Sequence, residues 1–241
     1  MQDYDISDSL DVTHEWTTPI GSINIYLPDV VRTALVGIMT KCQNVFTGNN
    51  YDGTGNEFDA KTYNLFDYSN KEWNENEIRC LQEFEKIASK IIRTYIKKAW
   101  NMDENVNIQA RCFGNIQRTH SMRTLPHYHH GWDGVLSHYL TVGDEFKFPT
   151  EDPDAQDDEL PPFDNPDTSG SLLLLDPRPS IKVPNNNKAK TIIPKIGTTI
   201  LHPGYVWHET HGHTRAGVRS AIIVNFNIEN TNYGILPTKL I

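Results

Sequence analysis

Three histidines and an aspartate lie within seven residues of this chain, in the stretch HYHHGWD at 127–133. Side chains two positions apart on a β-strand point to the same side, so a strand here would turn His127 and His129 the same way. Imidazole is the commonest protein ligand of transition metals, and two or three imidazoles with open coordination positions suit iron, zinc, copper or nickel. The H-x-H pair therefore indicates a metal site.

A second histidine segment, ILHPGYVWHETHGH at 200–213, offers a further ligand. Gly197 begins a predicted strand, Pro203 and Gly204 turn the chain, and His208 follows the turn. A lone histidine is more often an ordinary residue than a ligand. We therefore expect no metal binding by the isolated His14, His120 and His138, and we expect His211 and His213 at the rim of the site.

Composition narrows the class of protein. The formal net charge of −9 disfavours a nucleic-acid partner, because a phosphate backbone is bound by clustered Lys and Arg. No stretch approaches the roughly 20 consecutive apolar residues of a membrane-spanning helix, and the acidic start MQDYDISDSLDV lacks the features of a secretory signal. Cys42, Cys80 and Cys112 form no C-x-x-C motif and are expected to be reduced. These features predict a cytoplasmic protein without a membrane partner.

The segments that position the histidines differ along the chain. The first part, 1–104, contains an alternating strand pattern at 22–28, an amphipathic helix pattern after Pro28-Asp29, and a long apolar helical face at 76–100. From 105 to 241, short extended runs are separated by Pro, Gly and Asp turns, which is typical of an antiparallel sandwich or barrel. The acidic, Pro-rich stretch 144–169 is predicted to be a surface loop, either a lid or a solvated insertion. We expect both parts to form one structural unit.

Three blocks of this sequence resemble the iron(II)/2-oxoglutarate-dependent dioxygenases, and in particular a small H-x-H subfamily that is related to prolyl hydroxylases and is often virus-encoded. The first block is HYHHGWDGVLSHYL at 127–140, and the second is LLLLDPRPS at 172–180. The third, GTTILHPGYVWH followed by VRSAIIVNF, is similar to G-x-x-x-x-F-P-x-x-x-x-H and R-x-S-x-x-x-N through Gly197, Pro203, His208, Arg219 and Asn225. The resemblance implies an all-β core, a double-stranded β-helix or jelly roll, with N-terminal helices packed on one sheet, α+β overall.

The resemblance also implies a site. His127 and His208 match the two histidines that hold Fe(II), and His129 stands where the family has a carboxylate, with Asp133 as the alternative third ligand. Arg219, together with Tyr139, matches the residues that bind 2-oxoglutarate; a guanidinium can meet a carboxylate in two hydrogen bonds. Two further positions depart from the family pattern: residue 221 is Ala where a hydroxyl is usual, and residue 202 is His where Phe is common.

The expected function is hydroxylation of a C–H bond of a small molecule or a peptidyl side chain, with prolyl as the leading substrate. Two alternatives stay open at this point. One is a cupin-type enzyme that uses three histidines without 2-oxoglutarate. The other is a non-catalytic jelly-roll protein of a virion, which would act through homo-oligomer or assembly contacts in the virion or in the cytoplasm of an infected bacterium. Four aromatic residues near the site are expected to be core rather than entrance residues: Trp132, Tyr139, Tyr205 and Trp207.

Overall fold

The computed structural model describes residues 6–15, 18–46, 56–57, 64–69, 73–118, 124–143, 168–178, 189–213, 217–228 and 238–241. The helices in this part of the chain are α1 (Ile6–Ser9), α2 (Asp29–Phe46) and α3 (Glu75–Trp100). The strands are β1 (Asp11–Glu15), β2 (Thr18–Asn24), β3 (Asn56–Glu57), β4 (Ile108–Arg118), β5 (Thr124–His127), β6 (Gly134–Gly143), β7 (Leu172–Leu175), β8 (Ala189–Ile192), β9 (Thr198–Pro203), β10 (His208–Thr210), β11 (Val218–Ile228) and β12 (Lys239–Leu240).

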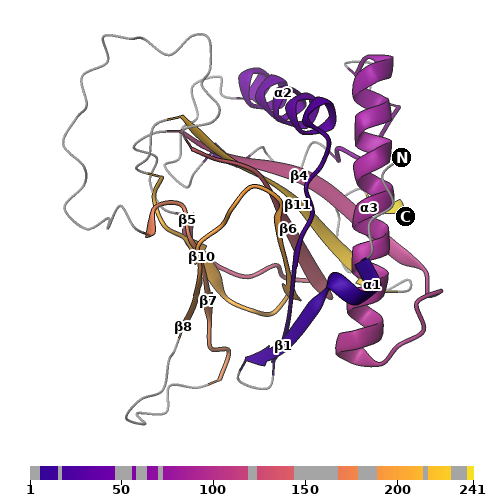
Figure 1. The fold of residues 1–241 in the computed structure, drawn as a ribbon, viewed down its shortest axis with the longest axis vertical. Coiled ribbons are helices and arrows are strands. Elements are labelled where there is room, and N and C mark those ends of the chain that lie inside the picture. Colours follow the sequence, from indigo (N-terminus) through magenta and orange to yellow (C-terminus); the bar gives the residue numbers. More distant parts are fainter. Residues whose placement is uncertain are drawn as a thin grey trace.

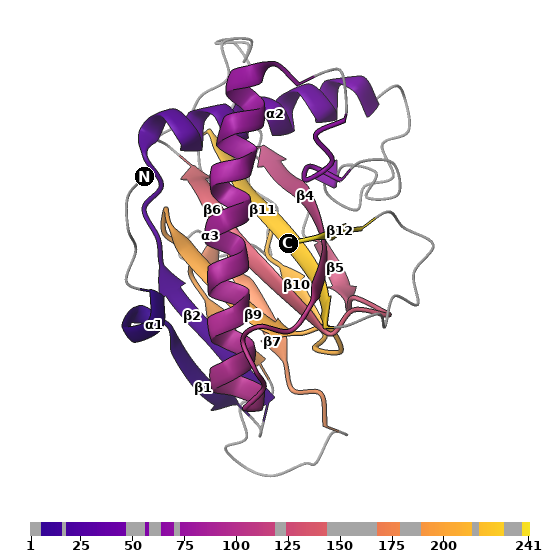
Figure 2. The ribbon, with the colours of Figure 1, turned by 90° about the vertical axis from the view of Figure 1, so that its right-hand side faces the viewer.

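The strands form two antiparallel sheets (Figure 1). The large sheet has eight strands, in the order β1-β2-β9-β6-β11-β4-β12 with β3 also paired to β4, and the small sheet has the order β5-β10-β7-β8. Figure 2 shows α3 lying across the outer face of the large sheet, with the small sheet on the opposite side. The predicted fold class is confirmed: a jelly-roll core with helices on one sheet, α+β overall.

The long helix predicted at 76–100 is present as α3, and local chemistry explains both of its ends. Asn74 caps the first turn in a capping box with Glu77: the Asn74 side chain accepts from the Glu77 backbone N–H, and the Glu77 carboxylate accepts from that of Asn74. At the other end, Asn101 adopts the left-handed conformation with φ 53°, which ends the helix. Between the caps, the apolar face at three- and four-residue spacing is buried.

The strands β4, β6 and β11 have two different faces. One face packs under the helices and is mainly apolar, with residues such as Leu136, Ile222, Val224 and Phe226 in the main hydrophobic core. The other face looks toward the small sheet and carries buried polar side chains, Arg111, Asn115, Gln117, Arg219 and Asn225. A smaller apolar cluster lies between the two sheets: Ile20, Leu172, Leu174, Ile200 and Val206. This alternation places polar groups inside the jelly roll.

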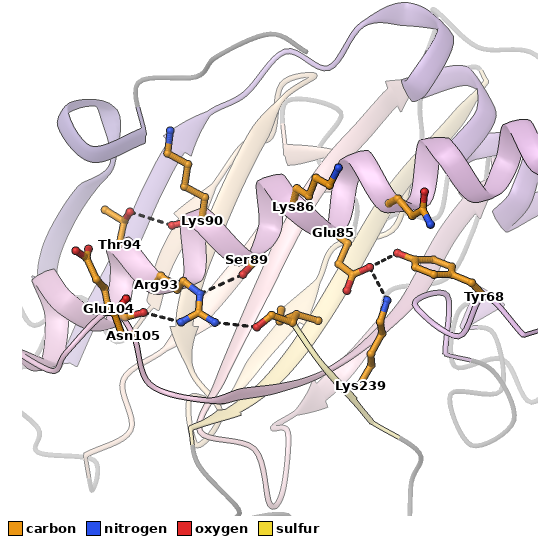
Figure 3. Close-up of a pocket in the computed structure, with 12 residues that line it drawn as sticks. Tyr68, Glu85, Lys86, Ser89, Lys90, Arg93, Thr94, Glu104, Asn105 and Lys239 are labelled. Carbon is orange, nitrogen blue, oxygen red and sulfur yellow. Dashed lines mark hydrogen bonds and ion pairs between the residues drawn. The ribbon is translucent and has the colours of Figure 1, made fainter.

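Arg93 on the outer side of α3 connects the helix to two distant segments (Figure 3). Its guanidinium donates to the backbone oxygens of Glu104 and Val106, at 2.6 and 2.8 Å, and to the oxygen of Ile241 at 2.8 Å. On the same side, Glu85 accepts from Tyr68 and pairs with Lys239 at 2.7 Å. These contacts hold the segment before β4 and the residue after β12 against α3.

Four other predictions bear on the framework. The division at 104/105 remains a prediction, but β2 from the first part pairs with β9 in the large sheet. The acidic loop lies outside the described residues except at 168 and 169. All three cysteines are buried, and none forms a disulfide. No helix among the described residues is long and apolar enough to cross a membrane.

A candidate metal centre between the sheets

Strand pairing in the small sheet gathers three histidines. His127 is the last residue of β5, His208 is the first residue of β10, and the two are register partners. His129 follows β5 by two residues, and its backbone N–H donates to the carbonyl of Gly204 at 2.9 Å. One ring nitrogen from each histidine lies within 4.8 Å of the others, and the Nε2 atoms of His129 and His208 are 3.3 Å apart. The structure thus brings together the three histidines that the sequence singled out.

Backbone carbonyls set the tautomer of two of these rings. His127 Nδ1 lies 2.8 Å from the oxygen of Leu125, and His208 Nδ1 lies 3.0 Å from the oxygen of Val206. Because a carbonyl oxygen only accepts, each Nδ1 carries the proton and donates it. Each Nε2 therefore keeps a lone pair, and this is the usual arrangement of a metal-binding imidazole.

Burial keeps two of these histidines, His129 and His208, uncharged. Burial, together with the neighbouring His202 and His127, lowers the pKa of His129 to about 3, while Asn225 opposes the shift. Burial also lowers the pKa of His208 well below its usual value, with added contributions from His202 and His129. Both rings are neutral near pH 7, so each has a nitrogen free to act as a ligand.

Asp133, the alternative third ligand, is turned away from this cluster. Its carboxylate oxygen Oδ2 accepts from the backbone N–H of Ile228 at 2.7 Å, and its own backbone N–H donates to Asn227 Oδ1 at 2.8 Å. Asp133 thus ties the start of β6 to the end of β11. The group of three possible ligands found among the described residues contains His129 and not Asp133, so the geometry favours His129.

Arg219 lines the same cavity as the three histidines. Its side chain is 3% exposed and donates to the Gly170 carbonyl at 3.1 Å, to Asn115 Oδ1 at 2.7 Å and to the Tyr139 hydroxyl at 3.2 Å. The guanidinium carbon also lies 4.9 Å from the centre of the Tyr139 ring. Burial lowers the pKa of Arg219, but a guanidinium stays protonated in proteins. Among the described residues, no carboxylate pairs with this buried charge.

The cavity between these groups has a volume of about 40 Å³. Its wall includes Phe113, whose ring stacks on that of His129 with 6.4 Å between ring centres. Ala221 lines it as well, at the position where the family usually has a hydroxyl. Gly170 completes the Arg219 end: its φ is +64°, and a Cβ there would lie 3.2 Å from Arg219 Cδ. The cavity therefore joins the three histidines at one end to the Arg219 cation at the other.

The remaining histidine predictions have mixed outcomes. His14 is exposed and His138 is buried and bonded to Thr199 Oγ1 at 2.7 Å, as expected of ordinary residues, whereas His120 lies outside the described residues. His211 is half-buried, with Nδ1 3.2 Å from Ser171 Oγ. The rim prediction is wrong for His213, which is fully buried. Hydrogen bonds hold the chain after β10 against the segment before β7: the Gly170 N–H donates to the Gly212 carbonyl at 3.0 Å, and the His211 N–H donates to the Ser171 carbonyl at 2.9 Å.

The core prediction for the aromatic residues is wrong for two of the four. Tyr139 is buried and Trp132 half-buried, but Tyr205 is 54% and Trp207 44% exposed. The reason is local: both lie in the turn between β9 and β10, which no helix or strand of the described part of the chain covers. Trp207 instead packs beside the exposed Tyr128, with 4.9 Å between ring centres.

Sequence reasoning missed two residues of the site. Asn115 holds the Arg219 guanidinium, and its only signal was a polar residue at alternate positions along a strand. His202 was noted as a departure from the family pattern, yet its ring centre lies 4.8 Å from that of His208. Neither position could be assigned a role before the inner face of its strand was known.

No family model and no curated protein matches the sequence. Solved structures do match. A Pseudomonas putida prolyl-4-hydroxylase has a TM-score of 0.53 at 12% identity, over 89% of this chain and 95% of that one. The Trichoplax adhaerens prolyl hydroxylase in complex with a hypoxia inducible factor peptide fragment has a TM-score of 0.54 at 14% identity, over 88% and 85%.

The chain has the fold of the prolyl hydroxylases. A non-heme monooxygenase, described as a ThoJ–Ni complex, shares it with a TM-score of 0.55 at 9% identity, over 98% of this chain and 83% of that one. At such identities the likeness concerns the fold, because one fold hosts many activities. Membership of the H-x-H subfamily and a viral origin remain predictions.

Proposed function

We propose that the protein is an Fe(II)- and 2-oxoglutarate-dependent dioxygenase that hydroxylates a C–H bond of a peptidyl side chain, with prolyl as the leading substrate. The observation that carries the proposal is the buried Arg219, which pairs with no carboxylate among the described residues and lies in the same cavity as three histidines. A buried cation is costly unless an anion compensates it. A divalent metal on three neutral ligands adds more positive charge to the cavity. A dianionic oxoacid would neutralise both ends.

The donor set fits a metal ion. His127 and His208 present Nε2 lone pairs fixed by backbone carbonyls, and His129 completes the group. Such N-donor sites suit iron, although an all-imidazole set leaves one more positive charge on the metal than the usual two histidines and a carboxylate. When bound, Fe(II) with 2-oxoglutarate and O₂ would supply the oxidation of the C–H bond, with loss of CO₂ from the oxoacid to give succinate.

The protein's own groups would bind and orient the oxoacid. The Arg219 guanidinium has five N–H donors, and the three contacts described above use one donor each. It can therefore still donate to a carboxylate. The Tyr139 hydroxyl accepts from Arg219 and can donate its own proton to the same carboxylate. Asn115 and Gly170 hold the guanidinium in place, which reduces the ordering cost when the ligand binds.

Two exposed aromatic residues support a peptidyl substrate. Tyr128 lies between His127 and His129, Trp207 directly precedes His208, and their rings contact each other at the surface. Exposed aromatic rings beside a site offer a flat apolar face, which proline-containing peptides use because they are already extended. The peptide complex of the Trichoplax adhaerens prolyl hydroxylase shows that this fold can bind a peptide.

A second candidate, an enzyme that uses the three histidines without an oxoacid, stays open because of the size of the cavity. The cavity of about 40 Å³ has room for an ion and a water or two, but not for a five-carbon diacid. The first candidate therefore requires side chains to separate when the oxoacid binds. The contact between Arg219 and Tyr139 is the one that would open.

A titration separates the two candidates. Under anaerobic conditions, the Fe(II)-loaded protein is titrated with 2-oxoglutarate while the visible charge-transfer band of an iron–oxoacid chelate is recorded. We expect a band in the native protein, no band in His208→Ala, and a band that needs more oxoacid in Arg219→Ala. His211→Ala, which alters a nearby half-buried histidine, is the matched control and should behave like the native protein.

The other outcomes are equally informative. Iron binding without a band would contradict the oxoacid and leave the three-histidine enzyme. A protein that binds no iron would contradict both enzymes and leave a structural jelly-roll protein.

A further inference from the structure

A fourth histidine faces the proposed metal centre. His202 lies on β9, two residues after Ile200, so both side chains point to the same face of the large sheet. Ile200 packs in the cluster between the two sheets, and His202 therefore also points into the jelly roll. Its ring is fully buried, and its centre lies 4.8 Å from that of His208.

The hydrogen bonding of His202 leaves one buried lone pair without a donor. Nδ1 lies 2.9 Å from the carbonyl oxygen of Pro203, so Nδ1 carries the proton and donates it. Nε2 then has only a lone pair, and no donor among the described residues reaches it. A buried acceptor that lacks a partner costs free energy comparable to a lost hydrogen bond, so the native state should supply a donor there.

The available donor is the metal centre itself. The three proposed ligands form one group within 4.8 Å, and His202 is not a member, so its Nε2 lies outside bonding distance of an ion held by that group. A metal on three histidines keeps open positions for water, and metal-bound water is a strong hydrogen-bond donor. A lone pair facing the centre from beyond the ligands is well placed to accept such a bond.

We propose that His202 is a positioning residue of the metal centre, whose Nε2 accepts a hydrogen bond from a water molecule on the metal held by His127, His129 and His208. This inference rests on the proposed metal centre and adds a residue to it. Phe, which is common at this position in the family that the sequence resembles, has no acceptor. Partners of this kind just outside the ligand set typically change metal affinity about 10- to 100-fold.

Co(II) binding tests the proposal, because Co(II) has a visible spectrum that reports its coordination. His202→Phe removes the acceptor and keeps a ring; we expect it to weaken Co(II) binding about 10-fold or more and to change the visible spectrum. His202→Gln keeps a side-chain oxygen that can accept, and should recover part of the affinity. His138→Gln replaces another fully buried histidine, on the opposite face of the sheet, and should bind Co(II) like the native protein.

The outcomes separate this inference from the function on which it rests. Native affinity and a native spectrum in a folded His202→Phe variant, with Co(II) bound normally by the native chain, would overturn the role of His202 alone. If the native chain bound no Co(II), the metal centre itself would be overturned, and the role of His202 with it.

A measurement on the native chain covers the case in which His202→Phe does not fold. Ring nitrogen signals of the histidines are followed by NMR as Zn(II) is added. We expect the Nε2 signal of His202 to remain that of an unprotonated nitrogen and to shift when Zn(II) binds, while the signals of His138 stay unchanged. An unchanged His202 signal in a protein that has bound Zn(II) would overturn the proposal.

Discussion

The two faces of the large sheet differ in what they contain, although the same strands build both. On β11, Ile222, Val224 and Phe226 alternate with Arg219 and Asn225, so that each apolar residue under the helices is followed by a residue that faces the small sheet. The outer face supplies the main hydrophobic core. The inner face buries polar side chains at a cost in stability and holds the candidate site. We infer that stability and function are assigned to opposite faces of one sheet.

The largest expected effect concerns stability on the outer face. Phe226 is fully buried and packed so closely that a Cβ on Gly134 would lie 2.2 Å from its Cζ. Phe226→Ala should lower the free energy of unfolding by about 3–5 kcal/mol. Phe113→Ala on the inner face should cost less, since that ring already borders a cavity. Urea unfolding measures both, and equal losses would contradict the division between the faces.

The pH dependence of stability gives the next effect. Burial on the outer face lowers the pKa of His138 to about 3, from its usual 6.5. Because the unfolded chain binds a proton there below about pH 6.5 and the folded protein does not, stability from His138 is present above that pH and is lost as the pH falls toward 3. The loss is about 1.4 kcal/mol per pH unit for one proton.

Unfolding of the metal-free protein by urea at pH 7, 6 and 5 tests this effect. The native chain should lose stability with falling pH, partly through His138 and partly through the inner-face rings, such as His129, whose pKa is also lowered. The free energy of unfolding of His138→Gln should fall less steeply with pH, by about 1.4 kcal/mol per pH unit, because its unfolded chain takes up one proton fewer. An identical slope in both proteins would show that His138 is protonated in the folded state.

The inner face should tolerate, and even gain from, an apolar substitution. Gln117 is fully buried on β4, and neither its amide nitrogen nor its oxygen has a hydrogen-bond partner in the described part of the chain. Gln117→Met has a similar shape and removes two unpaired polar atoms, so it should raise the free energy of unfolding by about 1–2 kcal/mol. Gln109→Met on the same strand is the control, because Gln109 is only half-buried. A loss of stability in Gln117→Met would indicate a partner for this amide.

The sequence was sufficient to predict those features that depend on residues close together in the chain. The 3.6-residue apolar period lies within α3, and the H-x-H spacing lies within one short segment. The pairing of His127 with His208 across the small sheet is a long-range contact, and it was anticipated only through the resemblance to a known family. Periodicity alone does not show which strands pair.

Other parts of the site depend on which face of a strand is buried. His202 and Asn115 are ordinary polar residues until the inner faces of β9 and β4 are known, so sequence reasoning gave them no role. The reverse error affected Tyr205 and Trp207, which were expected in the core because aromatic residues usually pack there. No described helix or strand covers their turn, and a hydrophobic residue in an uncovered turn stays exposed.

Replacement of Trp207 should have the smallest effect on stability. The same replacement tests whether substrate binding extends from the inner face to the surface of the protein. The Trp207 side chain is 44% exposed, and Trp207→Ala should change the free energy of unfolding by no more than about 0.5 kcal/mol. If the Tyr128–Trp207 pair contacts the substrate, the same variant should raise the KM for a proline-containing peptide in an oxoacid turnover assay and leave iron binding intact, because His208 keeps its carbonyl bond to Val206. Tyr26→Ala removes a more exposed aromatic ring, at the end of β2, and should leave both values unchanged. An unchanged KM in Trp207→Ala would place substrate recognition elsewhere and confine the functional role to the cavity between the sheets.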